Sequence, residues 1–186
     1  MVALARYLNR VVAAFVLSLA FAAPVVAQTT ELDRLFGELA DPDQPAWQRI
    51  EDQIWTEWSK SGSPAMDLLL QRGRDAMQAG DMDAAIEHLT ALVDHAPDFA
   101  EGWNARATAY FQAGLYGPSV SDIRQVLALN PRHFGALSGL GMILEETGNR
   151  ERALTVYRAA KAIHPHSPHI KDAIARLEHE TGGQEL

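Results

Sequence analysis

The chain has 186 residues, of which 47% are hydrophobic and 22% are charged, which is ordinary for a soluble globular protein and excludes a disordered chain. Its formal net charge of -8 gives no electrostatic footprint for nucleic acid and would be repelled by anionic lipid. Cysteine is absent, which excludes disulfides, thiolate metal sites, a cysteine nucleophile and a lipid-modified cysteine anchor.

Residues 1–27 have the pattern of an export signal. Arg6 and Arg10 supply the positive start, residues 11–23 form an apolar run that is short for a membrane span, and small residues precede Gln28. A second cleavage site after Ala22 is an alternative, and so is an uncleaved signal that anchors the chain. We expect cleavage, and therefore a mature protein outside the cytoplasm with no stable membrane insertion.

Residues 28–62 are predicted to form a helical hairpin, because two amphipathic stripes flank the helix-breaking segment 41–45. The stripes consist of Leu32, Leu35, Phe36 and Leu39, and of Trp47, Ile50, Ile54 and Trp58. We expect the second stripe to be buried against residues 66–99, because that segment begins a series of helical repeats whose first exposed face needs an end cap. A partner-binding patch of tryptophans is the alternative, and Trp55, which lies off the stripe, fits it best.

The segment 66–167 repeats with a period of 34 residues in three units, 66–99, 100–133 and 134–167. The interval separates Pro97, Pro131 and Pro165, and again Gly80, Gly114 and Gly148. In each unit, small or apolar residues at i, i+4 and i+7 mark one face of two successive helices. The glycines are expected to end the first helix of each unit as left-handed caps, and the prolines to end the second.

Small residues are paired where the two helices of a unit are expected to cross closely. The pairs are Gly73 with Ala85, Ala107 with Ser119, and Gly141 with Ala153. In the second unit, Pro118 predicts that the second helix starts about a turn late and that the loop at Leu115 and Tyr116 protrudes. Residues 168–181 are predicted to form a last helix whose buried side carries Ile170, Ile174 and Leu177.

The run W-N-A-R-A-T-A-Y at residues 103–110, followed by Ser119, Ile123 and Pro131, resembles the tetratricopeptide repeat (TPR). The resemblance implies an all-α fold, an alpha-alpha superhelix of three tandem helical hairpins closed by a C-terminal capping helix. It implies a concave groove that holds a peptide or a partner helix, and no chemistry. The chain also looks like the short exported TPR proteins of Gram-negative bacteria, which implies a periplasmic location.

The first helices of the three units are expected to line the groove with side chains that do not pack internally. The predicted binding residues are Arg74, Met77, Gln78, Asn104, Thr108, Phe111, Gln112 and Met142, and the same face carries Asp67, Leu70, Glu101, Ser138, Glu145 and Glu146. Amide side chains can bond a peptide backbone, and methionine and phenylalanine can accept apolar side chains. We place the ligand at repeats one and two; the alternative for this surface is an ordinary solvated helix face.

Chaperone-binding members of the resembled family hold a C-terminal carboxylate with lysine, asparagine and arginine at five groove positions. The corresponding residues here are Leu70, Arg74, Ala105, Gly135 and Gly139. Only Arg74 is basic, so we do not expect that ligand.

His164, His166 and His169 form the one metal-like cluster, and three imidazoles could hold a transition ion. Two intervening prolines fix an extended backbone and no fourth ligand is obvious, so we assign no metal and no cofactor. Motifs of serine hydrolases, zinc proteases and phosphate loops are missing, and we predict no enzymatic activity. The predicted function is a monomeric, non-catalytic adaptor or scaffold of the cell envelope that binds a protein or peptide. The alternative is a chaperone-like factor that delivers a substrate protein to a cytochrome-maturation or cell-wall enzyme.

Overall fold

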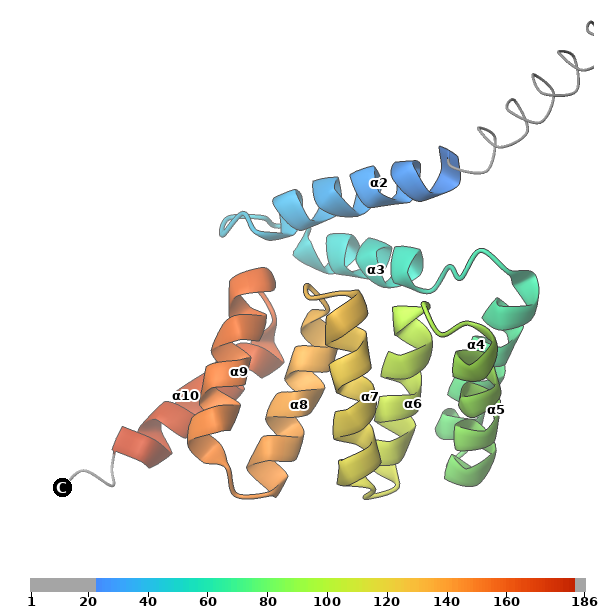
Figure 1. Ribbon diagram of the computed structural model, residues 1–186. Helices are drawn as coiled ribbons and strands as arrows, with labels where there is room; N and C mark the ends of the chain where they lie inside the picture. Colours follow the sequence, from blue (N-terminus) through green and yellow to red (C-terminus); the bar gives the residue numbers. More distant parts are fainter. Residues whose placement is uncertain (1–22, 183–186) are drawn as a thin grey trace, which may run out of the picture.

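The computed structural model of the protein describes residues 23–182, and in this range the chain forms nine helices and no strand (Figure 1). The all-α architecture predicted from the repeat is therefore confirmed. The helices are α2 (Ala23–Leu39), α3 (Trp47–Trp58), α4 (Pro64–Gln78), α5 (Met82–His95), α6 (Ala100–Gln112), α7 (Tyr116–Leu129), α8 (Phe134–Glu146), α9 (Arg150–Ile163) and α10 (Pro168–Gly182).

Helices α4 to α9 form three antiparallel hairpins, α4 with α5, α6 with α7 and α8 with α9, that stack side by side (Figure 1). The predicted helix ends at these glycines and prolines are confirmed. Gly80, Gly114 and Gly148 follow the first helices with φ of 79°, 73° and 75°, a left-handed conformation that only glycine adopts without steric cost. Each second helix ends two residues before its proline, as α5 does at His95.

The helices of each hairpin approach closely at small residues, as predicted, but the contact lies one turn further along in two repeats. A methyl group placed at Gly73 would lie 2.5 Å from Leu89, and one at Gly141 would lie 2.7 Å from the ring of Tyr157. Leu89 and Tyr157 are fully buried. Large second-helix side chains therefore occupy the space that these glycines leave.

The second repeat begins its second helix earlier than predicted. Helix α7 starts at Tyr116, so Pro118 lies within its first turn, where a missing backbone N–H breaks no helical hydrogen bond. Of the two loop residues expected to protrude, Leu115 is exposed, but the ring of Tyr116 packs 5.6 Å from the ring of Phe111. The predicted late start was wrong, since proline in the first turn is compatible with a helix.

The N-terminal hairpin (α2 and α3) forms as predicted but does not cover the first repeat. Figure 1 shows it crossing the ends of the stacked repeats. Trp58 stacks on His133 with ring centroids 4.1 Å apart, and Trp47 stacks on His166 at 6.0 Å. His133 lies between α7 and α8, where the second repeat meets the third, and His166 lies in the loop between α9 and the C-terminal helix α10. The expected burial against repeat one is therefore wrong: the tryptophan stripe finds aromatic partners on these loops.

Helix α10 packs on α9 and buries Ile170, Ile174 and Leu177, which confirms the predicted C-terminal helix. Between residues 23 and 182 no helix combines the length and the apolar character that a membrane crossing requires. Of the predicted export signal, residues 23–27 form the start of α2, and residues 1–22 lie outside the described part of the chain.

Candidate peptide-binding groove

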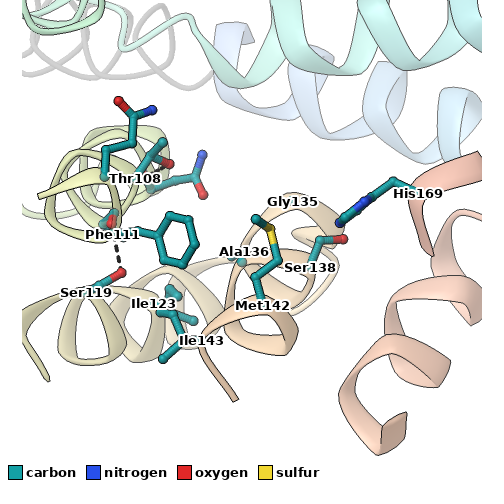
Figure 2. A pocket seen from close by; sticks show the side chains of 14 residues that line it. Thr108, Phe111, Ser119, Ile123, Gly135, Ala136, Ser138, Met142, Ile143 and His169 are labelled. Atoms are coloured by element: carbon teal, nitrogen blue, oxygen red, sulfur yellow. Dashed lines mark hydrogen bonds between the residues drawn. The ribbon is translucent and has the colours of Figure 1, made fainter. Parts of the chain in front are cut away.

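The first helices of the repeats lie next to one another, because α4 contacts α6 and α6 contacts α8. On this face, a cavity of about 290 Å³ opens between α6 and α8 (Figure 2). We call it the α6–α8 pocket. It is lined by Asn104, Ala107, Thr108, Phe111, Gln112, Ser119, Ile123, Gly135, Ala136, Ser138, Gly139, Met142, Ile143 and His169.

Helical spacing brings the predicted residues together. Asn104, Thr108 and Phe111 are four and three residues apart, which places them on one face of α6, and Gln112 extends that face. On the other side of the pocket α8 contributes Met142 (Figure 2). Five of the eight predicted binding residues therefore line one cavity.

The floor of the pocket is apolar and fixed by the core beneath it. Ile123 of α7 and Ile143 of α8 are each 3% exposed and belong to the cluster that also holds Phe111. Beside them the Ser119 hydroxyl donates a hydrogen bond of 2.7 Å to the Ala107 carbonyl, which ties α7 to α6. A buried apolar floor of this kind favours contact with an apolar group.

The polar side chains around this floor are uncharged, and some of them make no hydrogen bond. The Asn104 amide donates to Glu101 at 3.2 Å, and the Thr108 hydroxyl donates to the Asn104 carbonyl at 3.0 Å. Among the described residues, the side chains of Gln112 and Ser138 make no hydrogen bond, so both remain available to a ligand. No aspartate, glutamate, lysine or arginine lines the pocket, and His169 is its one titratable residue.

Arg74, predicted as the basic residue of the groove, holds the array together instead. Its guanidinium donates to the Glu101 carboxylate at 2.6 Å and to the Ser59 hydroxyl at 3.1 Å. Glu101 is 3% exposed and also accepts from His133, whose Nε2 lies 3.1 Å away. The other ring nitrogen of His133 accepts the Ala136 N–H, so Nε2 must carry the proton.

Arg74 therefore belongs to a buried polar cluster that joins repeats one, two and three. It also lines a separate cavity of about 510 Å³ between α4 and the N-terminal hairpin, together with Trp55 and Lys60. Met77 and Gln78 are placed away from the α6–α8 pocket as well. Met77 packs on the core of repeat one, and Gln78 is exposed at the end of α4.

His169 is the lining residue that sequence reasoning assigned to a different role. It lies at the start of α10 and follows Gly135 by 34 residues, which in turn follows Glu101 by 34. Extending the repeat period by one unit beyond α8 would have placed it on the groove face.

The three histidines considered for a metal site serve different parts of the structure. His164 is 1% exposed and lies 3.3 Å from the Glu51 carboxylate, while the His166 ring donates to the Asp41 carbonyl at 2.8 Å. His169 lines the α6–α8 pocket. Within residues 31–180, no three histidine, aspartate or glutamate side chains are grouped to hold a metal ion.

Glu51 and His164 contribute electrostatically to the docking of the N-terminal hairpin. The His164 imidazole beside it lowers the pKa of the Glu51 carboxyl, and partial burial opposes this shift without cancelling it. The folded structure therefore favours the ionised carboxylate. The pair joins α3 to the residue that follows α9.

Three tandem helical hairpins with a groove along their first helices define a helical-repeat protein of the solenoid type. The sequence match is more specific, because a family model described as tetratricopeptide repeat matches residues 70–117 and 119–168, just over half of the chain. The protein belongs to the tetratricopeptide repeat family.

Relatives of the chain agree with this assignment. A TPR repeat-containing protein of Rhizobium etli is 37% identical over 155 residues, which cover 82% of this chain and 75% of the relative. The small glutamine-rich tetratricopeptide repeat-containing protein 2 of Mycosarcoma maydis is 28% identical over 109 residues. That match covers 59% of this chain and 31% of the relative.

Solved structures show the same fold. The first TPR of Spaghetti (RPAP3), bound to an HSP90 peptide, superimposes with a TM-score of 0.62 at 22% identity, covering 64% of this chain and 95% of that one. MamA superimposes with a TM-score of 0.59 at 20% identity, covering 76% and 85%. At these identities the likeness concerns the fold alone.

Proposed function

We propose that the protein is a non-catalytic adaptor or scaffold that holds a segment of a partner protein in the α6–α8 pocket and along the adjoining first-helix face. The observation that carries the proposal is the pocket itself. An apolar floor is surrounded by amide and hydroxyl groups, two of which, on Gln112 and Ser138, have no hydrogen-bond partner among the described residues. Such a lining suits a polypeptide, because backbone amides need partners and side chains need apolar surface.

The fold supports the same proposal, since the superimposed TPR of Spaghetti is bound to an HSP90 peptide. The chemistry of that ligand does not transfer, because the present pocket has no lysine or arginine in its lining. The single arginine predicted for the groove, Arg74, is held by Glu101. The proposal therefore concerns a groove ligand of different chemistry.

Site-specific photo-crosslinking in cells that produce the protein tests the binding site. A benzophenone amino acid replaces Gln112 in the pocket or, as the matched control, Gln125, which is also an exposed glutamine but lies on α7. We expect one or a few discrete crosslinked partners from position 112 and none of these from position 125. Equal partner patterns from both positions would contradict the proposal, and the identity of the partner separates a scaffold from a factor that delivers a substrate to an enzyme.

We further propose that the protein acts in the cell envelope, in the periplasm, after removal of the signal in residues 1–27. The support is the order of positive, apolar and small residues in that segment. Cell fractionation with N-terminal sequencing of the mature protein tests this. We expect an envelope or periplasmic protein that begins at Gln28, or at Ala23 if the alternative site is used; a cytoplasmic protein that retains Met1 would contradict it.

A further inference from the structure

We infer that the α6–α8 pocket takes one bulky, uncharged, apolar side chain from an extended partner segment, and that Gly139 keeps the pocket open for it. The inference rests on the proposed function and adds the chemistry of the ligand and the residue that selects it. It predicts a specificity opposite to that of a carboxylate-binding groove.

The lining of the pocket has no lysine or arginine that could pair with an acidic ligand. Arg74, the arginine predicted for the groove, binds Glu101 at 2.6 Å, and Arg176 of α10 binds Glu145 of α8 at 2.5 Å. A carboxylate that entered the pocket would lose water without gaining a lysine or arginine partner, which is unfavourable. A lysine or arginine side chain would meet the same obstacle, because the pocket lining carries no acidic residue.

The size and the floor of the pocket indicate what enters it. About 290 Å³ is at the small end of ligand cavities, which span about 300–1,000 Å³, and suits a single large side chain. Phe111, Ile123 and Ile143 offer this side chain apolar contacts, and Met142 can adapt its shape. Gln112 and Ser138 at the same site can bond the backbone on either side of it.

Close packing does not explain why residue 139 is a glycine. A methyl group there would lie 3.8 Å from Ile123, an ordinary contact, so the fold has room for a side chain. The other glycine of the pocket differs, because a methyl group at Gly135 would lie 2.5 Å from the ring of Trp55. Glycine weakens a helix interior, and at position 139 the benefit that offsets this cost is the open pocket.

The test begins with random 12-residue peptides displayed on phage and selected on the purified protein. The affinity of the selected peptides is then measured by fluorescence anisotropy. We expect a consensus with one aromatic or large aliphatic residue between uncharged neighbours. We also expect that replacing this residue by glutamate weakens binding at least about tenfold, whereas about 0.5 M salt changes affinity little because no ion pair forms.

Variants of the protein then locate the site. Gly139→Leu should fill the pocket and weaken binding at least about tenfold, and Gly139→Ala, whose methyl group fits, should weaken it less. Gly117→Leu is the matched control, because Gly117 lies in α7 with nothing within 4 Å of the added methyl group; its affinity should stay within about twofold. Circular dichroism of each variant confirms that it folds.

The outcomes separate the inference from the proposed function. An acidic, salt-sensitive consensus, or affinity unchanged in both Gly139 variants while Gln112→Ala reduces it, would overturn the inference and leave the groove as the binding site. If no peptide is selected, or if binding is unchanged by every pocket variant, both the inference and the proposed function fail.

Discussion

Two glycines of α8 should respond differently to the same substitution. Gly141 faces the buried ring of Tyr157, and an added methyl group would lie 2.7 Å from it. Gly139, two residues earlier, opens on the α6–α8 pocket, where an added methyl group has ordinary contact only. Alanine at the two positions therefore makes the same chemical change in one helix but meets a different environment.

The magnitudes follow from two effects. Alanine in place of glycine within a helix stabilises by about 1 kcal/mol, whereas an extra methyl group in a packed core costs about 1–3 kcal/mol. Gly139→Ala gains the first effect without the second, so its free energy of unfolding should rise by about 1 kcal/mol. For Gly141→Ala the two effects oppose each other, and its free energy of unfolding should lie about 1–3 kcal/mol below that of Gly139→Ala.

Urea unfolding followed by circular dichroism at 222 nm measures the difference, with Gly139→Ala as the internal control. In thermal unfolding the two variants should differ by about 2–4 °C for each kcal/mol. Equal stabilities would show that Tyr157 moves aside at no cost, and would refute the reasoning that Gly141 is required by close packing between α8 and α9.

Three further predictions concern other parts of the fold. Arg106→Met should lower the free energy of unfolding by about 3–5 kcal/mol, because the buried Asp122, which Arg106 binds at 2.7 Å and 3.0 Å, would lose its partner. The double variant Arg106→Met with Asp122→Leu should recover most of this loss in urea unfolding. Absence of recovery would refute the role of the ion pair. Glu51→Gln should weaken the fall in the free energy of unfolding at acid pH. The lowered pKa of Glu51 contributes stability that is complete above the ordinary carboxyl pKa of 4.5 and is lost as the pH falls through the lower folded pKa. An unchanged dependence of stability on pH would contradict this. Trp58→Ala should weaken the packing of the N-terminal hairpin on the repeats by about 3–5 kcal/mol. Trypsin should then cut at Lys60 at least tenfold faster, while the circular dichroism of the repeats stays helical. Unchanged cleavage would show that the stacking of Trp58 on His133 does not hold the hairpin in place.

The repeats could be predicted from the sequence because each depends on local patterns. A 34-residue period, glycine caps and terminal prolines fix where the helices start and end, and α6 and α8 begin at Ala100 and Phe134 as the period requires. The place of the N-terminal hairpin could not be predicted in this way. It depends on His133 and His166, two polar residues far away in sequence that no apolar pattern includes.

The groove was predictable to the extent that it depends on one helix face. Spacing on α6 correctly gathers Asn104, Thr108 and Phe111, because a helix presents residues three and four apart on one side. The same rule places Arg74 on the groove face but cannot show that Glu101 binds it. Pairing between side chains of different helices is a tertiary property that spacing along one helix does not reveal. The ligand was predicted at repeats one and two, whereas the pocket lies between repeats two and three.

Methyl NMR of the protein with a selected peptide tests the central account most directly. If the pocket holds the ligand, the signals of Ile123, Met142 and Ile143 should shift in proportion to bound peptide. Those of Leu68 and Leu129, which are exposed on α4 and α7 outside the pocket, should not. Shifts confined to these exposed leucines, with the three pocket methyl groups unchanged, would contradict the account.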